Sequence, residues 1–293
     1  MAIKLYTKQY AGMLPELFAK KSAFLRAFGG TIQTIQGAEA NSNFLDLKTT
    51  DTDVVIQAYS TGAAVAFGAG TGNTNRFGAR KEVKSTDTQV PFDTPLSIHE
   101  GIDSFTVNDI PEQVVAERLA LHAVAWAEHY DGIMSALIST SASATLTETE
   151  LSETGVTKAF AEAHKKFVNN NVSNAVAWVA YVTADVYNFL IDSKLATTAK
   201  NSSANVDEQS LYKFKGFELA ELPDAKFLTG DNVYFVADGV GVAGVAIPVV
   251  RTMDSEDFAG VALQAAGKLG KYIPEKNKKA ILKASLAAVV PAG

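Results

Sequence analysis

The sequence contains no cysteine, which excludes disulfide bonds, thiolate metal sites and cysteine nucleophiles together. It also lacks a long apolar run, because the longest stretches, residues 175–182 and 240–250, are far shorter than the roughly 20 residues that span a bilayer. The first residues carry Lys4 and Lys8 without an apolar core, so we expect no signal peptide. These absences exclude a disulfide-stabilised secreted domain and a helical membrane protein. They are typical of a protein made in a reducing cytoplasm.

Sequence signatures of catalysis are scarce as well. Residues 239–244 match the pattern GxGxxG, but the next residues, Val-Ala-Ile-Pro-Val-Val, favour a strand where a dinucleotide site needs a helix. We therefore interpret the motif as a glycine-rich connection between strands. His122 and His129 lie seven residues apart on one expected helix, which is not the spacing of a chelating pair. We expect no enzyme activity, no metal and no cofactor, although an active site assembled from distant residues stays open.

The charge that is present is unevenly distributed along the 293 residues, whose net charge is −6. Residues 1–30 sum to 5 − 1 = +4, residues 100–153 to 1 − 10 = −9, and residues 268–283 to 6 − 1 = +5. Either these are three solvated faces of different sign, or they pair between copies of the chain or with a charged partner. A sequence-specific nucleic-acid module is not expected, because the chain is acidic and carries no recognition motif.

The clearest predicted element is a long helix over residues 109–138. Asp109, Pro111 and Glu112 provide its N-terminal signals. Apolar residues then recur on one helical face, and we expect the core of this helix to comprise Val115, Leu119, Trp126 and Ile133. His122 lies on the same face and is interpreted as a packed residue, while Gly132 is a candidate break.

Two segments before this helix look unable to bury their own apolar surface. Residues 1–30 form a basic, aromatic arm, and residues 54–92 form a long two-stranded excursion from strands at 54–59 and 83–92, with a glycine-rich tip. We expect both to lie on neighbouring copies of the chain. The predicted inter-subunit contacts are Tyr6, Tyr10, Phe18 and Phe24 in the arm, and Arg76, Arg80, Lys81 and Lys84 in the loop.

After a Ser/Thr/Ala linker at residues 139–149, the pattern becomes α plus β. We predict helices over 156–167 and from Thr183 to about residue 195. The predicted strands are 175–182, Phe217–Leu222, Val233–Ala237, 245–250 and 280–283, with an earlier one at 43–48.

The order of these elements resembles the major capsid proteins of tailed bacteriophages, the Hong Kong 97 type. Three stretches strengthen the resemblance: a strand followed by a capped helix at 177–192, a short strand at 214–222, and a tail at 267–283. The resemblance implies an α+β capsid fold with an N-terminal arm (1–30), a peripheral domain (31–149) and an axial domain (150–265). The peripheral domain would include an extended loop (50–100) and the long spine helix (109–138), and closing strands (266–293) would return to it.

The function implied by this resemblance is structural. Copies would assemble into hexamers and pentamers of an icosahedral head shell around double-stranded DNA. The chain would reside in the virion after assembly in the host bacterial cytoplasm. Its partners would be copies of itself, a separate scaffolding protein, a portal and decoration proteins, with only non-specific contact to packaged DNA. The alternatives are an encapsulin-like nanocompartment shell and, in another class, a cytosolic α/β enzyme that uses residues 239–244.

Some members of this family bond a loop lysine to an asparagine of a neighbour, a reaction that needs a neutral, desolvated lysine. Lys81 and Lys84 lie instead among Arg80, Glu82 and Asp87. We therefore predict a shell without covalent links.

Overall fold

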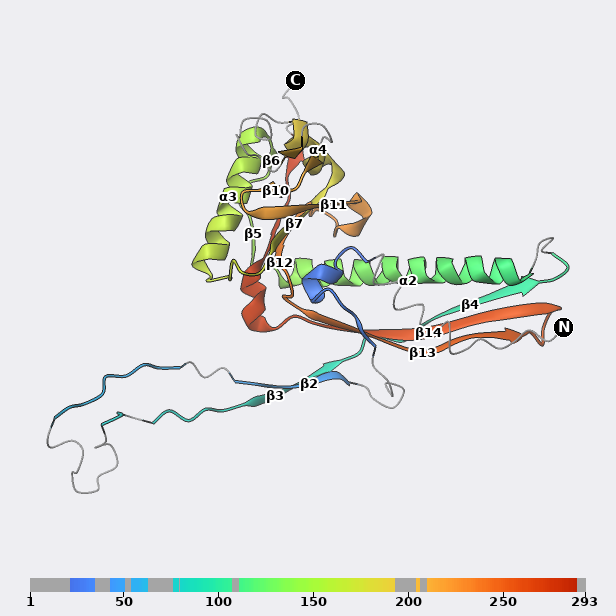
Figure 1. Ribbon diagram of the computed structural model, residues 1–293, viewed down its shortest axis with the longest axis horizontal. Helices are drawn as coiled ribbons and strands as arrows, with labels where there is room; N and C mark the ends of the chain where they lie inside the picture. The colour runs from blue at the N-terminus through green and yellow to red at the C-terminus, as the bar shows by residue number, and fades with distance from the viewer. Residues whose placement is uncertain are drawn as a thin grey trace. The chain divides into compact units, whose positions relative to one another are not determined.

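A computed structural model describes residues 22–34, 43–50, 54–62, 76–78, 80–106, 111–192, 204–205 and 210–288. The chain divides into two compact units (Figure 1), the smaller one being Asn43–Pro91 and the larger one the remainder. The α+β fold class predicted from the sequence is confirmed.

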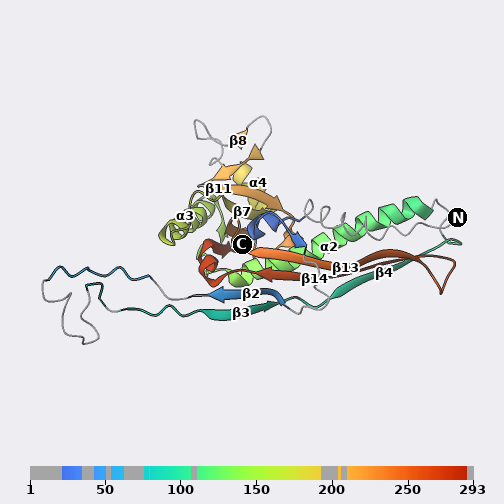
Figure 2. The ribbon, with the colours of Figure 1, turned by 60° about the horizontal axis from the view of Figure 1, so that its bottom comes forward.

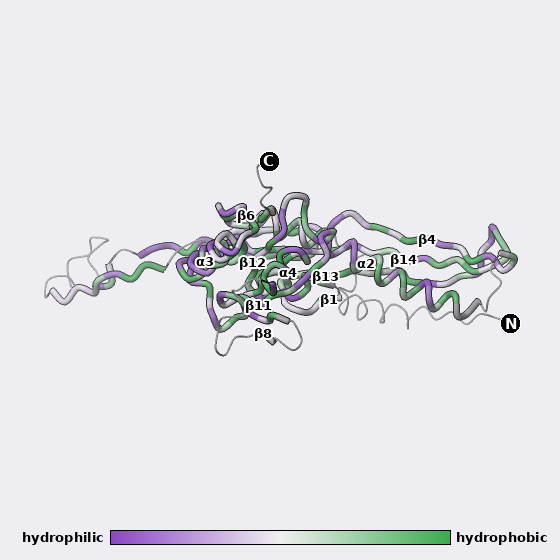
Figure 3. Tube along the Cα trace, turned by 90° about the horizontal axis from the view of Figure 1, so that it is seen from above, coloured by the Kyte–Doolittle hydropathy of each residue, from purple (hydrophilic) through white to green (hydrophobic). Residues whose placement is uncertain are grey.

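The centre of the larger unit is a six-stranded sheet. Its order is β10 (Lys213–Phe214), β11 (Phe217–Leu222), β7 (Trp178–Thr183), β12 (Val233–Ala237), β15 (Ile281–Ala284) and β5 (Ala144–Thr145). β7 and β12 are continuous apolar runs with every residue buried, as expected for central strands covered on both faces. The strands predicted at Phe217–Leu222 and Val233–Ala237 are confirmed, and Figure 3 shows hydrophobic stretches around β12 and α4 (Ala184–Asp192).

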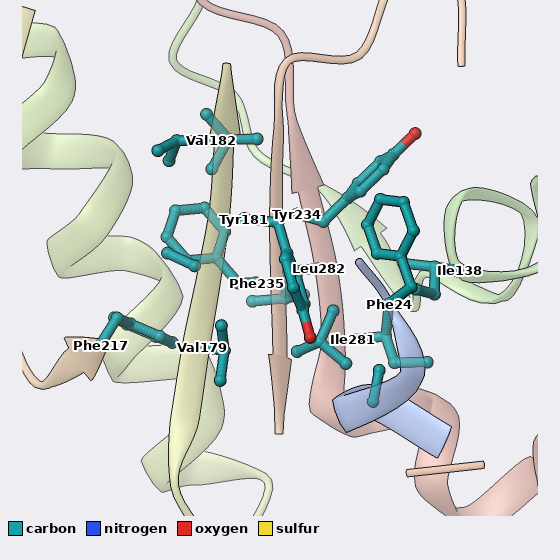
Figure 4. Packing of buried hydrophobic residues seen from close by; sticks show 14 of the residues in the cluster. Phe24, Ile138, Val179, Tyr181, Val182, Phe217, Tyr234, Phe235, Ile281 and Leu282 are labelled. Carbon is teal, nitrogen blue, oxygen red and sulfur yellow. The ribbon is translucent and has the colours of Figure 1, made fainter. Parts of the chain in front are cut away.

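Successive side chains of β12 point to opposite faces of this sheet. Phe235 packs on α3 (Glu153–Asn169), with ring centroids 4.9 Å from Phe160. Tyr234 points the other way, toward Phe24 and Ile138 (Figure 4). The N-terminus of α3 is capped by Ser152, whose hydroxyl accepts a hydrogen bond from the Gly155 amide at 3.0 Å.

The predicted long helix is α2 (Pro111–Ser141), which continues through Gly132 without a break. Its 31 residues correspond to a length of about 47 Å. It runs beside a four-stranded sheet in the order β1 (Gln33–Thr34), β13 (Val242–Asp254), β14 (Gly260–Tyr272) and β4 (Leu96–Asp103), as Figure 2 shows. Asp109, the expected cap, lies outside the described residues.

The start of the described chain packs against the glycine motif at residues 239–244. Residues Leu25–Phe28 form a short 3-10 helix, η1. The amides of Gly239 and Gly241 donate to the carbonyl oxygens of Arg26 and Ala27 at 3.2 and 3.1 Å. A Cβ on Gly241 would lie 2.8 Å from the Phe28 ring, so only glycine admits this approach. β13 begins at Val242, where a dinucleotide site needs a helix, which fits the predicted strand connection.

In the smaller unit, β2 (Asn43–Thr49) pairs antiparallel with β3 (Thr86–Pro91). The strand predicted at 43–48 is confirmed, but the strand predicted at 54–59 is wrong, because residues 54–62 have no regular structure. The β-branched residues there resemble a strand locally, yet among the described residues no strand pairs with them, and a single backbone hydrogen bond joins Ser60 to Arg76. The predicted loop, 50–100, stays a prediction; its last residues belong to β4, which pairs with β14 in the larger unit.

The division into peripheral and axial domains stays a prediction. The boundary between residues 265 and 266 falls inside β14. β15, one of the expected closing strands, pairs antiparallel with β12, and its residues Ile281 and Leu282 are buried. The small remaining elements are β6 (Glu150–Leu151) paired with β16 (Ala287–Ala288), β8 (Ala204–Asn205) paired with β9 (Ser210–Leu211), η2 (Asp224–Lys226) and η3 (Glu275–Ala280).

Candidate assembly surfaces

The arm residues predicted to contact neighbours divide into two groups. Tyr6, Tyr10 and Phe18 lie outside the described residues. Phe24 is fully buried in the core of its own chain, with ring centroids 5.1 Å from Tyr181 and 6.2 Å from Tyr234. Its assignment as an inter-subunit contact is therefore wrong: the ring is already covered by the same subunit, so no surface remains for another one.

The base of the arm is anchored by Asp131, a fully buried carboxylate on α2. It accepts hydrogen bonds from the Ser22 hydroxyl at 2.6 Å and the Ala23 amide at 3.0 Å, and it pairs with the Lys226 ammonium at 2.8 Å. A buried carboxylate is tolerated only when its charge and lone pairs are satisfied in this way. Asp131 thus joins the arm, α2 and η2. The sequence signal for this role is an acid set directly beside the apolar face of the helix, a signal absent from the sequence-based predictions above.

Arg26 makes a second connection from the arm. Its guanidinium contacts the carboxylates of Glu218 on β11 and Asp238 after β12, at 2.6 and 2.7 Å. The hydrogen bond from Arg26 lowers the pKa of Glu218, although partial burial acts in the opposite direction. The start of the described chain is therefore held in the larger unit by contacts on both sides of residues 23–25.

The four residues predicted as the core of α2 differ in burial. Leu119 and Trp126 are buried, and Val115 and Ile133 are half-buried against the apolar clusters beneath the helix. Between them, Glu100 on β4 accepts hydrogen bonds from the Arg118 guanidinium and lies 2.9 Å from Nε2 of the buried His122. The Arg118 hydrogen bond lowers the pKa of Glu100 to about 2, outweighing partial burial. This cluster fixes α2 on the edge strand β4.

The smaller unit carries the predicted basic residues of the loop. Arg80, Lys81 and Lys84 are exposed and Arg76 is half-buried. Lys84 lies 3.9 Å from the Glu82 carboxylate. The same unit exposes large apolar side chains: Val54 is 94% exposed and Ile56 95%, with Phe77 and Val83 also open to solvent. Monomeric proteins seldom leave such a run uncovered, so this surface is the strongest candidate for contact with another chain.

The described part of the chain gives little support for metal binding or for a membrane-spanning helix. No group of three or more His, Asp or Glu residues there is arranged to hold a metal ion. Among the same residues, no helix combines the length and the apolar character needed to cross a membrane.

The sequence and the structure give different results when each is compared with known proteins. No protein-family model matches the sequence, and no curated protein matches it. Solved structures do match. A structure from Mycobacterium phage Che8 aligns with a TM-score of 0.66 and 17% identity over 90% of each chain. The capsid of the cyanophage P-SCSP1u gives 0.66 and 11% over 92% of this chain and 89% of that one.

A structure outside the phages also matches. A virus-like particle from Pyrococcus furiosus aligns with a TM-score of 0.50 and 12% identity, over 96% of this chain and all of the other. The match to the phage structures is stronger and nearly as complete. The chain has the fold of tailed-bacteriophage capsid proteins, the fold that its order of elements predicted.

Proposed function

We propose that this chain is the major capsid protein of a tailed bacteriophage, a structural protein and not an enzyme. The observation that carries the proposal is the match to phage capsid structures over about nine tenths of this chain. Copies assemble into hexamers and pentamers that close into an icosahedral head around double-stranded DNA. The protein then resides in the virion, after assembly in the host bacterial cytoplasm. Scaffolding, portal and decoration proteins are its further proposed partners.

The exposed apolar residues of the smaller unit support assembly. Two paired strands are marginally stable alone. The apolar side chains of Val54, Ile56 and Val83 are exposed to water, and their burial would lower the free energy. We propose that residues 54–92 lie on an adjacent copy, where these side chains become buried and Arg76, Arg80, Lys81 and Lys84 meet acidic groups.

A nanocompartment shell is the second candidate, favoured by the match to the Pyrococcus furiosus particle over 96% of this chain. Both candidates predict closed shells, but only the capsid is built to enclose a genome. The enzyme alternative loses its basis, since Gly244 belongs to a strand and not to the turn before a helix.

Negative-stain microscopy of the purified full chain distinguishes these candidates. Large icosahedral shells, or shells formed on co-expression with the neighbouring head genes, are expected for the capsid protein. Small closed cages of uniform size would favour the nanocompartment. Low oligomers under both conditions would contradict a shell function of either kind.

A further inference from the structure

A hollow of about 1020 Å³ opens between α4, η2 and residues 227–232 of the larger unit. Its lining combines the apolar side chains of Phe189, Phe227 and Leu228 with four aspartates: Asp185, Asp192, Asp224 and Asp231. Asp231 is already neutralised, because its carboxylate pairs with Lys283 at 3.3 Å and accepts a hydrogen bond from Ser139 at 2.6 Å. Asp185, Asp192 and Asp224 are exposed, and within the described residues none of them has an ion-pair partner.

The opposite end of β11 presents a complementary surface. Lys215 and Gly216 form the two-residue turn between β10 and β11, and both have left-handed backbone conformations, with φ of 49° and 90°. Such a turn favours asparagine or glycine at its first position, so a lysine there is conformationally costly. Lys215 is exposed and has no ion-pair partner in the described part of the chain, and Tyr212 beside it is 58% exposed.

The geometry of one strand keeps these two surfaces apart. The basic turn precedes β11 and η2 follows it (Figure 1), so the six residues of β11 separate them by roughly 20 Å. The turn also lies on the α3 side of the sheet, where Gly216 approaches the His164 ring. Phe227, at the hollow, instead stacks on Tyr234 on the opposite face, at 5.0 Å. Lys215 therefore cannot reach the hollow of its own chain.

We propose that the β10–β11 turn of one copy inserts Lys215, flanked by Tyr212, into the hollow between α4 and η2 of the next copy. Lysine supplies a cation to Asp185, Asp192 and Asp224, which have no ion-pair partner among the described residues, and the tyrosine ring covers the apolar floor. Because the two surfaces differ and lie at opposite ends of β11, the contact is heterologous and repeats from copy to copy until a ring closes. The inference rests on the proposed shell function and names the contact that would form the capsomer ring.

The absence of cysteine makes this contact directly testable. In the variant Lys215→Cys/Asp224→Cys, oxidation of assembled shells is expected to yield covalent multimers of up to six chains on a non-reducing gel. A disulfide within one chain is impossible, because the two positions exceed the roughly 7 Å Cα separation that a disulfide permits. The matched control is Lys158→Cys/Asp224→Cys, whose first cysteine replaces an exposed residue of α3 outside the β10–β11 turn and is expected to stay monomeric.

Charge exchange provides a second readout. Lys215→Glu or Asp224→Lys alone is expected to lower shell yield by about tenfold, and the combined variant to recover it to within about twofold. Monomer bands from intact shells of the Lys215→Cys/Asp224→Cys variant, or equal cross-linking in the control, would overturn the proposed contact while leaving the shell function standing. Failure of the unaltered chain to form shells would instead count against the function on which the contact rests.

Discussion

Single carboxylates join elements of this fold that are far apart in the sequence. Asp131 on α2 receives the arm at Ser22 and the side chain of Lys226 on η2, and Glu100 on β4 receives Arg118 and His122 from α2. Without these carboxylates, the elements that they join would be held together by apolar contacts alone. Apolar contact does not fix direction, whereas hydrogen bonds to a charged group do.

Replacing Asp131 with asparagine should destabilise the larger unit by about 3 kcal/mol, because Lys226 loses its counter-charge in a largely buried position. Urea unfolding of the purified subunit measures the change. Glu128→Gln is the matched control, since Glu128 is exposed on the same helix and should change stability by less than about 0.5 kcal/mol. Equal stability of the two variants would mean that Asp131 carries no net stabilising charge interaction.

Glu100 predicts a dependence of stability on pH. Its pKa in the folded protein is about 2, against an ordinary value of 4.5. The carboxylate therefore stabilises the fold fully above pH 4.5, and this contribution is lost as the pH falls from 4.5 toward 2. We expect Glu100→Gln to be less stable by about 2 kcal/mol at pH 7, with the difference disappearing near pH 2. Chemical unfolding at a series of pH values tests this, with exposed Glu117→Gln as the control. A difference that is constant with pH would point to packing and not to charge.

At the scale of elements, most of the helices and strands could be predicted from the local periodicity of apolar residues. β7, β11, β12 and α3 were predictable because their apolar residues follow a strand or helix period and pack within the same layer. The structure of residues 54–62 was not predictable, because a run rich in valine and isoleucine becomes a strand only if a partner pairs with it. The docking of η1 on Gly239 and Gly241 depends on contacts between residues more than 200 positions apart. The pairing of β15 with β12 likewise joins residues more than 40 positions apart. For the proposed assembly surface, the sequence indicates which basic and aromatic residues are candidates. It does not indicate which of them are buried in the core of their own chain, as Phe24 is.

The long helix makes an element-scale prediction through Trp126, which is buried between α2 and the core. Trp126→Asp should leave the subunit unfolded or aggregated, because it removes a large apolar side chain and buries an unpaired charge. Solubility and circular dichroism of the expressed chain measure this. Leu121→Asp is the control, since Leu121 is an exposed residue of the same helix and should tolerate the charge. Soluble, folded Trp126→Asp would show that the face of α2 differs from the one described.

At the scale of the whole molecule, the basic residues of the smaller unit should act on association more than on folding. Replacing Arg76, Arg80, Lys81 and Lys84 with glutamate is expected to reduce shell yield strongly while the subunit keeps its unfolding midpoint, because charges at the rim of an interface affect encounter and not the core. Sedimentation of assembled particles and urea unfolding of the subunit separate the two effects. A variant with lysine and arginine exchanged at the same positions controls for shape. Normal shell yield from the glutamate variant would contradict the proposed position of residues 54–92 on a neighbour.

The shell as a whole should be held together without covalent bonds. Bond formation between a lysine and an asparagine needs an uncharged amine held away from water, beside a carboxylate that moves protons. Lys81 and Lys84 are exposed, and the Lys84 ammonium lies 3.9 Å from the Glu82 carboxylate, so neither amine is held away from water. Because the chain has no cysteine, a denaturing gel of boiled particles reports on such bonds alone. We expect a single band near 31.1 kDa, with the shell dissociating into single chains once its apolar and ionic contacts are disrupted. A ladder of multimers, or material too large to enter the gel, would show that a lysine elsewhere in the shell is desolvated enough to react.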